Sequence, residues 1–415
     1  MKRTGSRVGA VLVAGLLAGG CTGGDGNWTG TVTDSAGVAI VQNPEAGMWP
    51  AEGGPTVADE LTIGKEGDPN YQFAMIAGVD VASDGTIFAL DMQGRHVKVF
   101  DATGTWLRSL GGPGSGPGEL SQMAMGLMVT AGDTVLVPDI MQQRLNRYLP
   151  DGTPVGELSM PMAAGVAVRW AERPDGMLIQ ESRVMQLPGM EAVEPRLHLL
   201  RRQAGGELVD TLLTFPITQS FEFSTEGGQL SASIRLFESE PVWALAGDGS
   251  VLFAMNSDYS ISVYSPEGQL ERIIRRAWVK KPVTEADRQG FLTMMKELWS
   301  NAGVPAQAMD MLMQSVSFAD FYPAFTNLMG GPDGSLWVQR VQTAADLGEG
   351  VEFNPQDMGS PVWDVFDREG RYLGVVTLPD RFTPGRLVED KLYGIWRDDL
   401  DVQYVKVLRI TMPAE

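Results

Sequence analysis

The chain has 415 residues, of which 43% are hydrophobic and 20% are charged, a balance typical of a globular protein. With 52 acidic and 32 basic residues its formal net charge is −20, which disfavours nucleic acid as a partner because binding to a phosphate backbone relies on clustered Lys and Arg. The single Cys excludes a disulfide framework, and two His leave little for an imidazole metal site.

The first twenty residues have the pattern of an export signal. Lys2, Arg3 and Arg7 form a basic start, and the apolar run over residues 8–17 is too short to span a bilayer. Small residues then stand directly before Cys21, the only cysteine of the chain.

Residues 17–21 (LAGGC) resemble the lipobox of bacterial lipoproteins, although Ala18 stands where Leu is more common. The resemblance implies a lipoprotein signal peptide over residues 1–20, lipidation at Cys21 and attachment to a membrane through this lipid anchor. Thr22 replaces the Asp that marks inner-membrane retention in some lipoproteins, which favours the outer membrane, with the protein facing the periplasm or the cell surface. The alternative is a cleaved secretory signal with an incidental cysteine, and both interpretations export the chain.

The segment after the signal has a different composition. Residues 21–37 are rich in Gly, Thr and Asp and contain few apolar residues, which predicts a flexible tether. The folded domain is therefore expected over residues 38–415.

A short turn followed by an apolar strand recurs six times in this domain. Each of these strands is followed by a second strand with alternating apolar residues, and in the first five units a glycine turn and a third strand follow. Repeated hairpins of this kind are typical of propeller blades, so the sequence predicts an all-β, six-bladed β-propeller. The six turns are Asp84-Gly85, Gly132-Asp133, Asp175-Gly176, Asp248-Gly249, Asp333-Gly334 and Glu389-Asp390.

The sixth unit ends after its second strand, Val402–Ile410, so that one strand is missing. Residues 61–64 precede the first unit in the same way that residues 107–111 precede the second. We therefore expect Leu61–Gly64 to complete the last blade, which would remove a sheet edge that invites aggregation. Residues 38–41 also have a strand pattern, whose place the sequence does not fix.

Two segments carry a resemblance to a known family. Residues 111–120 (GGPGSGPGEL) resemble the Gly-rich segment that joins blades in NHL-type six-bladed propellers. Residues 78–104, including Asp91 and Arg95, resemble the repeat unit of that family. The resemblance is strong only in the first two units, and it implies a bacterial lipoprotein version of the six-bladed propeller.

Residues 283–329, between the fourth and fifth units, break the strand pattern. Thr284 and Asp287 have the spacing of a helix cap, and Pro305 opens a second helix. We expect a helical hairpin inserted between blades 4 and 5, which either packs on the propeller for stability or covers the central channel, since Met-rich surfaces adapt to varied apolar ligands. The apolar face of its first helix comprises Phe291, Met294, Met295, Leu298 and Trp299.

Polar residues end the first regular strand of each unit. We expect these residues either to bind a ligand at the channel mouth or to stabilise turns, as the pairs Asp91–Arg95 and Asp139–Arg144 suggest. They are Asp91, Asp139, Glu181, Asn256, Arg340 and Arg397.

No motif identifies a catalytic residue, a metal site or a cofactor. His96 and His198 lie in different units without a metal-spaced partner, and the sequence has neither an Asp-x-Asp-x-Asp run nor a Gly-x-Ser-x-Gly elbow. We therefore expect a membrane-anchored extracytoplasmic module that binds a small ligand or an envelope protein at its channel mouth, or serves as a scaffold. The alternative is an exported metal-dependent hydrolase or lyase, because lactonase-type and amidating-lyase-type propellers resemble this fold.

Overall fold

The structure is a computed structural model, and it describes most of the chain from Trp28 onward. The signal peptide and Cys21 lie outside the described residues. The described ranges are 28–50, 53–162, 165–186, 193–218, 221–226, 229–301, 303–331, 334–347 and 358–413.

In the described part of the chain, six antiparallel four-stranded units follow one another and form the blades of a propeller. The first blade is β4 (Ile76–Val81), β5 (Ile87–Asp91), β6 (His96–Phe100) and β7 (Trp106–Leu110). The second is β8 (Met128–Val129), β9 (Val135–Asp139), β10 (Arg144–Tyr148) and β11 (Pro154–Ser159). The third is β12 (Val166–Glu172), β13 (Leu178–Val184), β14 (Arg196–Arg202) and β15 (Leu208–Pro216).

The second half of the ring repeats this order and confirms the predicted six-bladed propeller. The fourth blade is β18 (Pro241–Leu245), β19 (Val251–Met255), β20 (Ser260–Tyr264) and β21 (Leu270–Arg276). The fifth is β23 (Phe325–Gly330), β24 (Leu336–Val341), β25 (Gly359–Phe366) and β26 (Tyr372–Thr377). The sixth is β27 (Phe382–Val388), β28 (Lys391–Arg397), β29 (Gln403–Thr411) and β3 (Thr56–Ile63).

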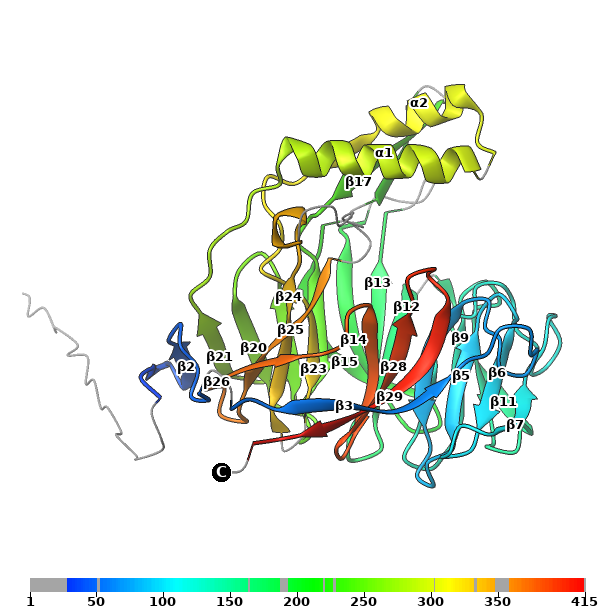
Figure 1. The fold of residues 1–415 in the computed structure, drawn as a ribbon, viewed down its shortest axis with the longest axis horizontal. Coiled ribbons are helices and arrows are strands. Elements are labelled where there is room, and N and C mark those ends of the chain that lie inside the picture. The colour runs from blue at the N-terminus through cyan, green and yellow to red at the C-terminus, as the bar shows by residue number, and fades with distance from the viewer. Residues whose placement is uncertain are drawn as a thin grey trace, which may run out of the picture.

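The sixth blade takes its outer strand from the N-terminal side of the chain. β3 pairs antiparallel with β29, with Ile63 opposite Val405 and Leu61 opposite Val407, and the blue and red strands lie side by side in Figure 1. The strand is longer than the expected Leu61–Gly64, because it begins at Thr56. Both ends of the propeller domain therefore contribute to one sheet, and β29 has no free edge.

The first described residues form a hairpin rather than a tether. β1 (Thr31–Ser35) pairs with β2 (Val38–Asn43), which adds in parallel to β21 at the outer edge of the fourth blade. All five residues of β1 are exposed, so backbone pairing and not burial holds this strand, and composition alone could not reveal it. The predicted tether over residues 21–37 was therefore wrong for Thr31–Ser35.

Asn43 fastens this hairpin to the fifth blade. Its side-chain amide donates to Gly370 O at 2.9 Å, and its Oδ1 accepts hydrogen bonds from Tyr372 N and Trp28 Nε1. Asn43 is buried, so these bonds satisfy a polar group that would otherwise destabilise the fold.

Two insertions from different parts of the chain form a cap above one face of the propeller (Figure 1). One is the hairpin of β16 (Phe221–Glu226) and β17 (Gln229–Leu236), which the sequence did not predict. The other is α1 (Glu285–Asn301), α2 (Ala306–Gln314) and β22 (Val316–Phe318), and β22 pairs in parallel with β17. We call these five elements the cap.

The expected helical insertion over residues 283–329 extended too far. Phe325 and Leu328 already belong to β23 and are buried between blades, so the chain from Phe325 onward is part of the fifth blade. The helix start was right: Thr284 N donates to Asp287 Oδ2 at 2.8 Å, and Asp287 N donates to Thr284 Oγ1 at 3.2 Å.

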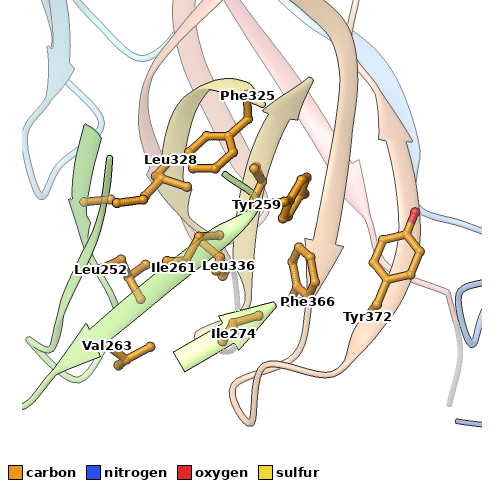
Figure 2. Close-up of a cluster of buried hydrophobic side chains, with 13 residues drawn as sticks. Leu252, Tyr259, Ile261, Val263, Ile274, Phe325, Leu328, Leu336, Phe366 and Tyr372 are labelled. Carbon is orange, nitrogen blue, oxygen red and sulfur yellow. The ribbon is translucent and has the colours of Figure 1, made fainter. Parts of the chain in front are cut away.

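The core lies between adjacent blades. Figure 2 shows one such layer, where Ile261 and Ile274 of the fourth blade face Phe325, Leu328 and Phe366 of the fifth. Large apolar side chains that fill the space between twisted sheets supply most of the stabilisation of such a fold.

A buried carboxylate also joins these two blades. Asp364 is fully buried and accepts hydrogen bonds from Tyr259 Oη at 2.7 Å, Tyr372 Oη at 2.9 Å and Arg340 Nη2 at 2.7 Å. Burial, and then the charge of Asp364, raises the pKa of Tyr372 to about 12, so the phenol remains a hydrogen-bond donor at neutral pH. This network satisfies a charge that would otherwise be costly to bury.

The seam between β3 and β29 can be tested by truncation. A chain that begins at Lys65 lacks β3 and exposes the edge of β29, so we expect it to aggregate or to lose cooperative thermal unfolding. A chain that begins at Pro55 keeps β3 and is the matched control, because both truncations lack β1 and β2. Equal melting temperatures for the two would contradict closure of the ring by β3.

Candidate functional site

The first strand of each blade lines a central channel. These six strands, β4, β8, β12, β18, β23 and β27, surround a cavity of about 1170 Å³. Glycines allow neighbouring inner strands to approach each other: a Cβ on Gly385 would lie 2.9 Å from Val79 O, and one on Gly330 would collide with Leu245 O. The inner strands therefore come closer than larger residues would permit.

Several charged groups in the channel connect blades to one another. Asp80 on β4 accepts hydrogen bonds from Val129 N at 2.7 Å and Val81 N at 2.8 Å, and Arg386 Nε lies 3.8 Å from its Oδ1. Burial raises the pKa of Asp80, and the charge of Arg386 opposes this shift. Asp80 thus links the first, second and sixth blades and is engaged in the fold.

A second cavity, of about 710 Å³, lies between the cap and the third and fourth blades. Its walls include residues 234–237, at the end of β17, and Pro241–Trp243 of β18. Val168 and Arg169 line both cavities, so they mark the junction between the channel and this cap-side cavity.

Three charged side chains and one tryptophan, joined by hydrogen bonds, form one wall of the cap-side cavity. Arg169 Nη1 donates to Trp243 O at 2.6 Å, and its guanidinium carbon lies 4.9 Å from the centre of the Trp243 ring. Trp243 Nε1 donates to Glu181 Oε2 at 2.7 Å, and Arg183 Nε donates to Glu181 Oε1 at 2.6 Å. Glu181 and Trp243 are buried, so these contacts fix the wall before any ligand arrives.

The cap is packed on the propeller by an apolar cluster. The ring of Phe237 lies 4.9 Å from that of Tyr322 and 6.0 Å from that of Phe291 on α1, measured between centroids. Met294 and Met295 pack against the same cluster, as the predicted apolar face of the first helix requires. The cap therefore covers the cavity as a packed layer.

The structure places two of the six predicted site residues, Glu181 and Asn256, in the lining of the cap-side cavity. Asn256 Oδ1 accepts a hydrogen bond from Glu240 N at 2.7 Å, and its Nδ2 donates to Phe325 O at 2.8 Å. This residue lines the cavity and also connects the fourth and fifth blades.

Asp91 and Asp139 hold the chain connections that enter the first two blades. Asp91 accepts hydrogen bonds from the backbone amides of Ala74, Met75 and Gly94 at 3.0–3.2 Å. Asp139, which is fully buried, accepts hydrogen bonds from Ser121 N, Ser121 Oγ and Gln142 N. Both side chains thus stabilise loops, as one of the two predicted roles requires, although their partners are backbone and serine groups.

The two remaining predicted residues, Arg340 and Arg397, lie beside aspartates. Arg340 donates two hydrogen bonds to Asp364, and Arg397 lies 3.9 Å from Asp401. Arg144, expected beside Asp139, forms an ion pair with Glu157 at 2.8 Å.

Sequence reasoning missed the channel lining itself. The repeat was counted from the turn that follows the inner strand of each blade. The inner strands, with the lining residues Asp80, Arg169 and Arg386, therefore lay outside the recognised repeat unit. The available signal was the glycines at Gly330 and Gly385 in strand-like segments, which mark close approach of another backbone.

The histidines lie apart, and neither belongs to a cluster. His96 Nδ1 lies 2.8 Å from Gly94 O in the first blade, and His198 Nδ1 lies 2.9 Å from Thr214 Oγ1 in the third. Within the described ranges, no group of three or more His, Cys, Asp or Glu side chains is arranged to hold a metal ion. None of the helices in those ranges is long and apolar enough to cross a membrane.

The loop-holding role of Asp139 predicts a stability effect. Asp139→Ala leaves three donors without an acceptor, of which two are buried, so the free energy of unfolding should fall by roughly 2–3 kcal/mol. Asp258→Ala, at an exposed position, is the control and should change it by less than about 0.5 kcal/mol. Urea titration measures both, and an unchanged midpoint for Asp139→Ala would contradict the structural role.

Comparison with known proteins supports the fold. A family described as a 6-bladed beta-propeller matches residues 71–185. A predicted exported protein of Bacteroides fragilis is similar in structure at 11% identity and a TM-score of 0.51, over 90% of this chain and 99% of that one. A Bacteroides vulgatus protein is similar at 9% identity and a TM-score of 0.50, over 87% of this chain and 99% of that one.

Enzymes are among the more distant structural matches. Virginiamycin B lyase from Staphylococcus aureus is 12% identical with a TM-score of 0.42, over 86% of this chain and 99% of that one. No curated protein matches the chain in sequence. Taken together, the comparisons and the sheet order identify this chain as a six-bladed β-propeller.

Proposed function

We propose that this protein is a lipid-anchored, extracytoplasmic β-propeller that binds a ligand or a protein segment in the cap-side cavity. The observation that carries the proposal is that β17 of one insertion, which pairs with β22 of the other, lines a cavity of about 710 Å³ that meets the channel at Val168 and Arg169. This volume lies within the usual range of small-molecule sites, and such sites combine apolar walls with a few fixed polar groups. The wall formed by Trp243, Glu181 and Arg183 is of this kind.

The lipobox-like residues before Cys21 support export and anchoring. Trp28, seven residues after Cys21, is already held to Asn43, so the intervening chain can span at most about 25 Å. The anchor would therefore keep the fourth blade, which carries β2 on its outer edge, close to the membrane. Thr22 favours the outer membrane, with the propeller facing the periplasm or the cell surface.

The Gly-rich segment supports a relationship to NHL-type propellers. Residues 111–120 connect β7 of the first blade to β8 of the second, which is the position that this segment takes between blades in that family. Gly116 N donates to Glu119 Oε2 at 2.7 Å, and Arg144 Nη2 donates to Gly116 O at 2.8 Å, so the middle of the segment is held in place.

A binding or scaffold role is preferred to catalysis because Glu181 and Asn256, the predicted site residues that line the cavity, are engaged in hydrogen bonds within the protein. Glu181 accepts bonds from two side chains, and Asn256 bonds with two backbone groups. A general acid or base must instead be available to the substrate. The alternative of an exported metal-dependent hydrolase or lyase is left to direct test.

The anchor is tested by Cys21→Ser. Several acyl chains hold a protein on a membrane stably, so removal of their attachment site should move the protein from the membrane fraction to a soluble or unprocessed form. Fractionation and intact-mass analysis measure this. A processed product that stays in the membrane fraction would rule out the lipoprotein assignment.

The metal-dependent alternative is tested by thermal unfolding with Ca²⁺, Zn²⁺ and Mn²⁺. A binding module without a metal site should keep its melting temperature, whereas a metal that binds the native state raises it. A reproducible rise with one ion would favour the hydrolase or lyase.

The cap-side cavity is tested with Nile red, a neutral dye that fluoresces in apolar surroundings. Val168→Trp fills the junction of the two cavities and should remove most of the fluorescence gain. Val155→Trp is the control, because Val155 is similarly exposed, at 40% against 43%, but lies on the outer strand β11. Equal dye binding by the two variants, or none by the unmodified protein, would contradict binding in this cavity.

A further inference from the structure

We propose that the junction between the channel and the cap-side cavity is a carboxylate-binding subsite, in which Arg169 binds the acid group of an amphipathic ligand whose apolar part lies under the cap. The inference rests on the proposed function, since it specifies the chemistry of the ligand that the same cavity receives.

Arg169 has capacity that the protein does not use. A guanidinium carries five N–H donors, and the contacts of Arg169 are one hydrogen bond to Trp243 O and the face of the Trp243 ring. Among the described residues no carboxylate lies within ion-pair distance of it. The ring and the carbonyl fix the orientation of the guanidinium and leave other donors for a ligand.

The position of Arg169 makes this unpaired charge significant. Arg169 is exposed at the junction of the two cavities; desolvation by nearby protein groups lowers the pKa of its guanidinium, and the charge of Glu181 opposes this shift. Arginine stays charged under such conditions. Because Arg169 is exposed and has no ion-pair partner among the described residues, its free donors can bind an anion that enters the junction.

The other charges around the cap-side cavity are already paired or exposed. Glu181 binds Arg183, and Arg235 lies 3.9 Å from Glu238. Glu240 also lines the cavity and is exposed. Arg169 is therefore the cation of this described lining that lacks an acidic partner, in a chain whose net charge is −20.

The surroundings of Arg169 favour a carboxylate with an apolar tail. A single planar guanidinium matches one carboxylate in a bidentate fork, whereas phosphate sites gather several donors or a helix N-terminus. Val168, next in the chain, is 43% exposed at the junction, and Val242, Pro323 and Met358 supply apolar surface on the cap side. A ligand of this class would place its acid at the junction and its tail under the cap.

The test compares three ten-carbon probes of different charge on the full chain carrying Cys21→Ser. Decanoate should bind about fivefold more tightly than decanol, since an exposed ion pair contributes up to about 1 kcal/mol, and decylammonium should bind most weakly. Arg169→Met should remove the preference for decanoate and leave decanol binding unchanged. Titration calorimetry and Trp fluorescence measure these affinities.

Arg202→Met is the matched control, because Arg202 also stacks on a tryptophan of the third blade, Trp170 at 5.7 Å, but does not line the cavity. It should keep the preference for decanoate. Arg169→Lys keeps the positive charge but loses the bidentate geometry of the guanidinium, so we expect an intermediate preference for decanoate. If Arg169→Met does not fold, Arg169→Lys and the three probes still test the inference.

Equal binding of decanoate and decanol, or an unchanged preference in Arg169→Met, would overturn the inference while leaving the proposed cavity intact. Uptake of Nile red without binding of any ten-carbon probe would overturn it as well. If the unmodified cavity takes up neither Nile red nor a probe, the proposed function fails together with the inference.

Discussion

The antiparallel pairing between β3 and β29 is the contact on which the ring depends. In each of the other five blades the four strands follow one another in the chain, whereas the sixth blade combines strands from both ends of the domain. At the seam, an N-terminal strand is hydrogen-bonded to the last strand, with Ile63 opposite Val405. Backbone pairing of this kind fixes the register of the sixth blade and covers its edge. The positions of the six inner strands, and hence the shape of the channel, follow from it.

Once the ring is closed, the two faces of the propeller differ because of the cap. β17 comes from the connection between the third and fourth blades, β22 from the connection between the fourth and fifth, and their parallel pairing brings the two insertions together. The cavity lined by β17 meets the channel at Arg169, whose orientation is set by Trp243. Residues 234–237, at the end of β17, form one wall of this cavity before a ligand binds, which lowers the entropic cost of binding.

The architecture could be predicted from the sequence because it repeats. Glycine turns and alternating strands recur six times, and the missing strand of the last unit has a match near Leu61, so blade number and closure were accessible. The helix cap at Thr284 and Asp287 was also recognisable, since it depends on local spacing. The β16–β17 hairpin, β1 and the end of the insertion at Phe325 were not, because pairing with distant segments and burial between blades decide them.

The candidate site was predicted only in part for the same reason. Glu181 and Asn256 were identified from their repeat positions, and both line the cap-side cavity. Arg169 was missed because its significance lies in what surrounds it: a tryptophan from the next blade and the lack of an acidic partner among the described residues. Hydrogen exchange of the full chain with and without decanoate tests the account most directly. It predicts protection in β12, β17 and β18, and protection confined to other blades, or none, would contradict it.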